Sequence, residues 1–371
     1  MFVWPTSHMG MMHPAGDIKA RNMAKDFLIY AEASEAGVSY KDAKTLLAVS
    51  KNQAETRKSF YEELALLYVP YRSNRIILTP LGRQLFDLLY GADLANLSSD
   101  VTRQATALIV WAMCRSQINR PQSRGVPQLA DFEWKACSVR PYAAAWQAIS
   151  DLAGELSLDE FMGALRHLQK HEQYPSVIER IEAARASGQQ LASENDLGGR
   201  TLMNYRIYWR SHLSLAEQVL RWDQKNLKLT IVPENWDIVK AALQFQAGCA
   251  ADMQAVLGAA PWADADDYFM NVAGAACPPF LATGAPTLTT FEGQTLADLS
   301  GYSLDSLTLA GGPELCHLKI LMPCFHPDSP HRLLRIDAKQ QTGSSILLRM
   351  GLGRPIVNLA VLKAALENGN G

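Results

Sequence analysis

The chain has 371 residues, which is enough for two or three domains. Apolar residues make up 48% of it, enough for sizeable cores, and charged residues make up 19%. The formal net charge is −2, so the chain as a whole is not a polycation. Any surface that binds nucleic acid must therefore be a local basic patch.

The spacing of the cysteines and the length of the apolar runs predict the cellular compartment of the protein. No CxxC pair occurs among the cysteines, which stand far apart at positions 114, 137, 249, 277, 316 and 324. This spacing predicts free thiols in a reducing cytoplasm. No apolar run is long enough to cross a bilayer. Residues 1–16 are expected to form a flexible tail, with alternative starts at Met9, Met11 and Met12.

A regular series of elements is predicted for residues 17–95. Ser39 has Asp42 at the capping distance, and Pro80 stands where a helix can begin because its missing N–H has no partner there. The predicted order is a helix over 18–34, a capped helix from Ser39, a third helix over 52–67, a strand over 76–78 and a helix that starts at Pro80.

The same order returns about 153 residues later, within residues 138–245. Ser157 has Glu160 at the capping distance, and Pro233 starts the last helix. The second copy has additional predicted helices before its strand, so that its elements are expected over 141–153, 157–171, 174–187, 200–221, 227–232 and from Pro233. Agreement at several points indicates an internal repeat.

In both copies a strand and a Pro-started helix follow a polar, basic turn, and this pattern resembles the wing of a winged-helix domain. The resemblance implies duplex DNA binding, with the start of the third helix presenting residues to base edges. It assigns base contacts to Asn52, Gln53, Arg57 and Lys58, and wing contacts with phosphate or the minor groove to Arg72, Arg75, Lys225 and Lys228. A solvated helix face is the alternative.

Residues 96–137 are expected to connect the copies through a buried helix over 98–115 and an exposed basic loop. Three arginines in the loop, Arg115, Arg120 and Arg124, are candidates for contacts with a DNA backbone, although a soluble linker has the same composition. Arg206 and Arg210 share a helix face beside aromatic residues. Such a face can bind nucleic acid, and the alternative is that the aromatic residues belong to the core.

Residues 246–371 are expected to form an α/β domain. The part over 246–310 contains seven acids and no Lys or Arg, which predicts a packing layer or a surface for other protein subunits. Strands are then expected over 317–322, 333–336 and 344–350, with a final helix over 355–367.

A second resemblance concerns catalysis. Pro327-Asp328, followed after eight residues by Asp337-Ala338-Lys339, resembles the PD-(D/E)xK nuclease motif. The resemblance implies that Asp328 and Asp337 hold Mg²⁺ while Lys339 positions the attacking water. A polar hairpin is the structural alternative. A soft-metal site is a further alternative, built from Cys316, His317, Cys324, His326 and His331.

Taken together, the sequence predicts a mostly α protein with small β wings in a tandem winged-helix arrangement, plus a C-terminal mixed α/β domain. The favoured function is duplex DNA binding, and no cofactor is expected for it. Because the architecture resembles the recognition regions of type IIS restriction endonucleases, a recognition subunit of a bacterial restriction or phage-defence system is expected. The alternatives are a Mg²⁺-dependent endonuclease and a winged-helix module for protein assembly.

Overall fold

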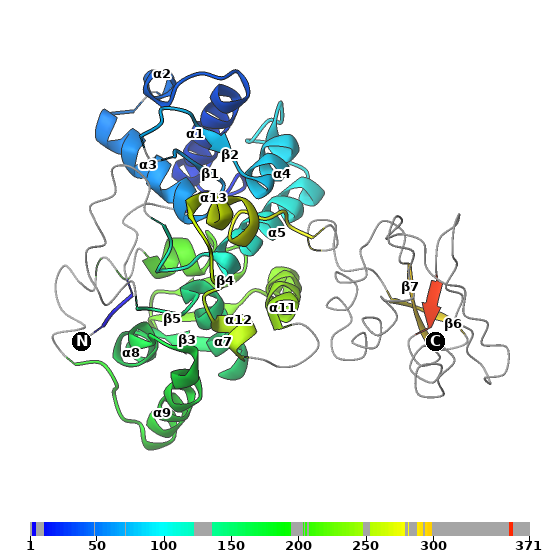
Figure 1. The fold of residues 1–371 in the computed structure, drawn as a ribbon. Helices are drawn as coiled ribbons and strands as arrows, with labels where there is room; N and C mark the ends of the chain where they lie inside the picture. Colours follow the sequence, from blue (N-terminus) through cyan, green and yellow to red (C-terminus); the bar gives the residue numbers. More distant parts are fainter. Residues whose placement is uncertain are drawn as a thin grey trace. The chain divides into compact units, whose positions relative to one another are not determined.

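The computed structural model describes residues 2–4, 11–47, 49–70, 72–121, 136–193, 203, 205, 208–247, 253–278 and 281. It also gives the strands β6 (Leu288–Phe291), β7 (Gln294–Asp298) and β8 (Ile356–Asn358). The fold is mostly helical with few short strands, as the sequence predicts (Figure 1). In the described residues no helix combines the length and the apolar character needed to cross a membrane.

Two compact units divide the chain. One comprises Met1–Val239 with Met253–Cys277, and the other Lys240–Asp252 with Pro278–Gly371. The predicted boundary at residue 246 is therefore wrong, because residues 253–277 belong to the first unit. In the second unit β6, β7 and β8 form an antiparallel sheet in that order. β8 occupies the start of the predicted final helix, since Ile356 and Val357 are β-branched and suit a strand.

The first repeat, residues 17–95, has the predicted helices and strand, although the helix predicted over 52–67 stops at Glu63 and a further strand follows it. These are α1 (Ile18–Glu35), α2 (Tyr40–Leu46), α3 (Lys51–Glu63), β1 (Leu67–Tyr68), β2 (Ile77–Leu78) and α4 (Pro80–Leu89). The predicted caps are confirmed, because the Ser39 hydroxyl accepts the Asp42 N–H and Pro80 lies in the first turn of α4. β1 and β2 are antiparallel, with Tyr68 opposite Ile77.

The second repeat, residues 138–245, is built on α7 (Pro141–Asp151), β3 (Glu155–Ser157), α8 (Leu158–Gly163), α9 (Tyr174–Ser187), β4 (Leu220–Asp223), β5 (Lys228–Ile231) and α11 (Pro233–Ala247). Its three strands form an antiparallel sheet in the order β3-β5-β4. Two predicted helices are too long: the helix predicted over 157–171 ends at Gly163, and the helix predicted over 200–221 gives way to β4.

Residues 1–16 do not form a loose tail where the structure describes them. Trp4 is 1% exposed, its indole Nε1–H donates to the Leu168 carbonyl at 2.7 Å, and its ring packs edge-on against Phe161. Met11, Met12 and His13 are also buried. The expectation of a flexible tail is wrong for these residues because a buried tryptophan with a satisfied N–H anchors the segment to the second repeat.

Between the repeats runs α5 (Ser99–Arg115), which the sequence predicts as a buried helix. The repeats also touch directly through polar and aromatic groups. The Tyr142 hydroxyl donates to Glu63 Oε1 at 3.0 Å, and the Phe60 and His212 rings meet edge to face. The two repeats therefore share one core within the first unit.

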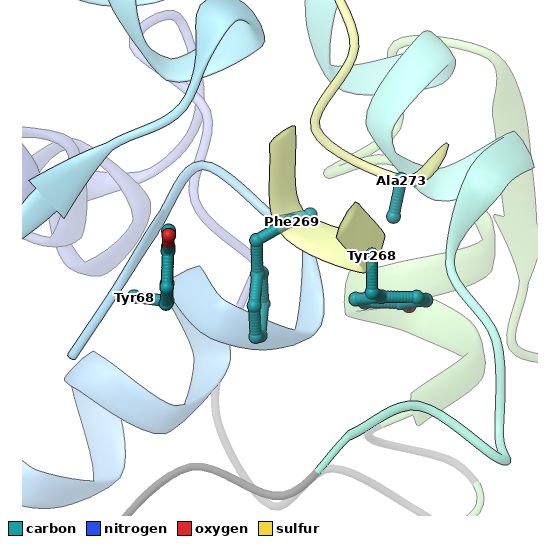
Figure 2. Packing of buried hydrophobic residues seen from close by; sticks show 5 residues of the cluster. Tyr68, Tyr268, Phe269 and Ala273 are labelled. Carbon is teal, nitrogen blue, oxygen red and sulfur yellow. The ribbon is translucent and has the colours of Figure 1, made fainter. Parts of the chain in front are cut away.

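The segment 253–277 packs on both repeats. α12 (Met253–Leu257) lies against α7, where the Arg140 N–H donates to the Leu257 carbonyl, and the part that begins with α13 (Ala265–Asp267) lies against the first repeat. Phe269 stacks on Tyr68 of β1 with ring centroids 4.5 Å apart, as Figure 2 shows. The Tyr68 hydroxyl also donates to Asp266, and both rings are buried. This part of the Lys/Arg-free stretch is therefore a packing layer on the chain's own hairpin.

Gly82 in α4 allows a close approach that a side chain would prevent. A Cβ there would lie 1.8 Å from the Leu66 carbonyl oxygen, which belongs to the backbone. Gly82→Ala is expected to lower the free energy of unfolding by about 1–3 kcal/mol, because the α4 start must shift. Thermal unfolding measures the change. In Gly37→Ala the added Cβ meets open space at a positive φ, so only a backbone cost of about 1 kcal/mol is expected. If Gly82→Ala lowered the free energy of unfolding no more than Gly37→Ala does, crowding by the Leu66 carbonyl oxygen would be contradicted.

Candidate nucleic-acid interface

The start of α3 is exposed and capped. The Ser50 hydroxyl accepts the Gln53 N–H at 3.3 Å, and the Gln53 side chain accepts the Ser50 N–H at 3.2 Å. This capping box fixes the first turn, and it occupies the side-chain amide oxygen of Gln53 as a hydrogen-bond acceptor. Lys51 and Asn52 are exposed beside it. An amide and an ammonium group are therefore offered to solvent at a helix N-terminus.

The loop between β1 and β2 carries two further cations. Arg72 and Arg75 are both exposed, and Arg72 adopts a left-handed backbone with φ 62°. The loop is held at its base, where the Tyr40 N–H donates to the Asn74 carbonyl and Ser39 forms a β-bridge with Arg75. These contacts anchor the loop to the start of α2.

A network of charged groups joins α2 to α3. Glu55 accepts hydrogen bonds from the Tyr40 hydroxyl at 2.6 Å and from Lys44 Nζ at 2.5 Å. Burial by itself would raise the Glu55 pKa, but the hydrogen bonds from Lys44 and Tyr40 outweigh it and hold that pKa below its usual value. Burial and the bond to Glu55 raise the Tyr40 pKa.

The depressed Glu55 pKa predicts an acid-dependent contribution to stability. A carboxyl group with a lowered folded pKa stabilises the fold above its unfolded pKa of about 4.3, and this stabilisation is lost as pH falls through the folded value. Glu55→Gln should therefore reduce stability at neutral pH and have less effect in acid. Urea unfolding of both proteins between pH 7 and pH 3 gives the comparison. If the difference in unfolding free energy between the two proteins stayed constant over this pH range, protonation of Glu55 would not be linked to stability.

Several predicted DNA-contacting residues are engaged inside the protein. Arg57 pairs with Asp26, and Arg120 lies 3.6 Å from Glu63. Lys58 is 1% exposed and lies 3.3 Å from Glu62. Arg115 donates to the Val272 carbonyl and lies over the Trp111 ring, and burial lowers its pKa to about 10. The expectation that Lys58 and Arg115 contact DNA is corrected here, because their charged groups are buried and already bonded.

The β4–β5 hairpin of the second repeat presents less positive charge than the β1–β2 hairpin of the first repeat. Lys225 is exposed in a turn whose N–H groups donate to Asp223. Lys228 Nζ lies 2.8 Å from Glu155 on the neighbouring strand β3. Arg210 belongs to a π-helical turn, Tyr208–Leu213, whereas Arg124 and Arg206 lie outside the described residues. Of the predicted wing residues, the exposed cations are Arg72, Arg75 and Lys225.

The predicted catalytic and metal-binding residues cannot be placed. Asp328, Asp337 and Lys339 lie outside the described residues, as do the five cysteines and histidines over 316–331. Among the described residues no group of three His, Cys, Asp or Glu side chains could hold a metal ion.

Sequence reasoning missed three lysines on the same repeat, Lys41, Lys44 and Lys51. A local charge count would have found them, because residues 39–79 contain seven Lys and Arg against four Asp and Glu in a chain of net charge −2. The repeat thus carries a local positive excess. We call the exposed set Lys41, Lys51, Asn52, Arg72 and Arg75 the basic face.

No protein-family model matches the chain, and neither does any curated protein.

Proposed function

We propose that the protein binds duplex DNA through the first repeat, which acts as a winged-helix-like reader. The observation that carries the proposal is the basic face: exposed Lys51 and Asn52 at the start of α3, in the same repeat as the exposed loop arginines Arg72 and Arg75. A recognition helix presents its N-terminal residues to base edges, and a neighbouring loop adds phosphate contacts.

The residue chemistry supports a division of roles. Asn52 has an amide that can form a bidentate contact with adenine, whereas the Gln53 carbonyl oxygen is engaged in the cap. Lys51, Arg72 and Arg75 supply charge for phosphates. Lys225 in the second repeat would add one further contact. The recognition role is thus assigned to α3 and most of the affinity to the cations around it.

The direct test is duplex binding by fluorescence anisotropy across a series of salt concentrations, without added metal. Each neutralised phosphate contributes about 0.9 to the log–log salt slope, so Lys51, Arg72 and Arg75 together should give a slope of about −2.7, and a contact from Lys41 or Lys225 would steepen it further. Binding with a slope near zero, or no binding at low salt, would reject the proposal and favour the assembly-module alternative.

A further inference from the structure

A pocket of about 400 Å³ lies between α2, α3 and the β1–β2 loop. Its lining includes Lys41 and Lys44 of α2, Glu55 and Lys58 of α3, and Ser73 and Asn74 of the loop. The volume falls within the range of small-molecule sites. Three lysines against one glutamate among the lining residues favour an anionic ligand.

The lysines are held in place by their surroundings. Lys44 Nζ lies 4.6 Å and Lys58 Nζ 5.3 Å from the centre of the Tyr40 ring, and Tyr30 stacks on the same ring. The cation–π contacts and the bonds to acidic neighbours orient both ammonium groups before any ligand arrives. Lys41 is exposed and forms no ion pair with the described residues. Because Glu55 and Glu62 balance Lys44 and Lys58, Lys41 supplies the uncompensated charge.

We propose that this pocket binds a terminal phosphate monoester. Such a group carries close to two negative charges at neutral pH and three acceptor oxygens, which suits neighbouring ammonium groups and the polar Ser73 and Asn74. Lys58 lines the pocket but is 1% exposed, so Lys41 and Lys44 are the lysines that a ligand can contact without a side-chain movement. A terminal phosphate has one ester link and enters a recess more readily than a backbone phosphodiester, which is flanked by sugars on both sides. The monoester comes from a free mononucleotide or from the 5′ end of a DNA strand; only the second source rests on the proposed function.

Titration of the full chain with adenosine 5′-monophosphate by calorimetry tests the first source. Lys41→Ala should weaken binding about tenfold, because it removes the uncompensated charge. Glu55→Gln should tighten binding several-fold, because the carboxylate no longer competes for Lys44. A variant that merely loosens the fold would not bind more tightly. Lys19→Ala, an exposed lysine of α1 outside the pocket, is the matched control and should bind as the parent does. Adenosine, which lacks the phosphate, should not bind.

Two duplexes that differ only in a 5′-phosphate or a 5′-hydroxyl test the second source. Tighter binding of the phosphorylated duplex, lost in Lys41→Ala but kept in Lys19→Ala, would assign the pocket to a DNA end. Failure of both the nucleotide and the 5′-phosphate to bind, or binding that neither Lys41→Ala nor Glu55→Gln changes, would overturn the pocket proposal. Equal binding of the two duplexes with a steep salt slope would leave the proposed DNA function in place, so the two failures are distinguishable.

Discussion

Replacing both Arg72 and Arg75 with alanine is expected to weaken duplex binding about a hundredfold at moderate salt, or about 2.8 kcal/mol. Both side chains are exposed on the β1–β2 loop, so their charges are accessible to phosphate groups. Two lost phosphate contacts should also make the log–log salt slope about 1.8 units less steep. Anisotropy titrations over a series of salt concentrations measure both quantities.

Two controls separate this effect from a general loss of charge or structure. Lys25→Ala removes an exposed cation from α1, outside the basic face, and should leave the salt slope unchanged. Asn52→Ala should reduce discrimination between duplex sequences by about 1–3 kcal/mol while keeping the slope, because an amide reads bases and neutralises no phosphate. An Arg72/Arg75 double variant that binds with the parental slope would remove the loop from the interface.

The parts of the fold that could be predicted are those whose signals are local. Ser39 and Ser157 accept N–H groups three residues ahead, and Pro80 and Pro233 each start a helix, so a few neighbouring residues contain the whole signal. The strand that follows each polar turn comes from an equally local pattern. The sequence therefore predicts these two strands and the order of the helices beside them, but not the strands β1, β3 and β4.

Whether a charged side chain is available to contact DNA could not be predicted, because this depends on partners that are distant in the sequence. Arg57 meets Asp26 of another helix, and Arg115 bonds to a carbonyl 157 residues away at Val272. Nothing near an arginine in the sequence shows whether an acid or a carbonyl will lie against it in the fold. The same reason explains Trp4, whose hydrogen-bond acceptor at Leu168 is 164 residues away. The charge count over residues 39–79, in contrast, is a local signal that was open to sequence reasoning.

Phe269→Ala is expected to lower the free energy of unfolding by about 3–5 kcal/mol and to release the segment around α13 from the first hairpin. Phe269 is 2% exposed, stacks on Tyr68 and contacts Tyr268, so its removal leaves a cavity between two elements far apart in the sequence (Figure 2). Because the chain contains two compact units, a single global transition is not assumed. Amide hydrogen exchange in β1 and β2 gives the local readout, and protection there should fall.

Tyr68→Phe is the matched control for this change, since it keeps the stacked ring and removes only the hydroxyl that donates to Asp266. Its expected cost is about 1 kcal/mol, the net value of one hydrogen bond. If Phe269→Ala lost no more protection than Tyr68→Phe, the stacking would not hold the segment. The larger predicted loss would instead mean that the Lys/Arg-free segment stabilises the hairpin that carries Arg72 and Arg75. Duplex binding by the Phe269→Ala protein should then weaken as well, although every residue of the basic face is retained.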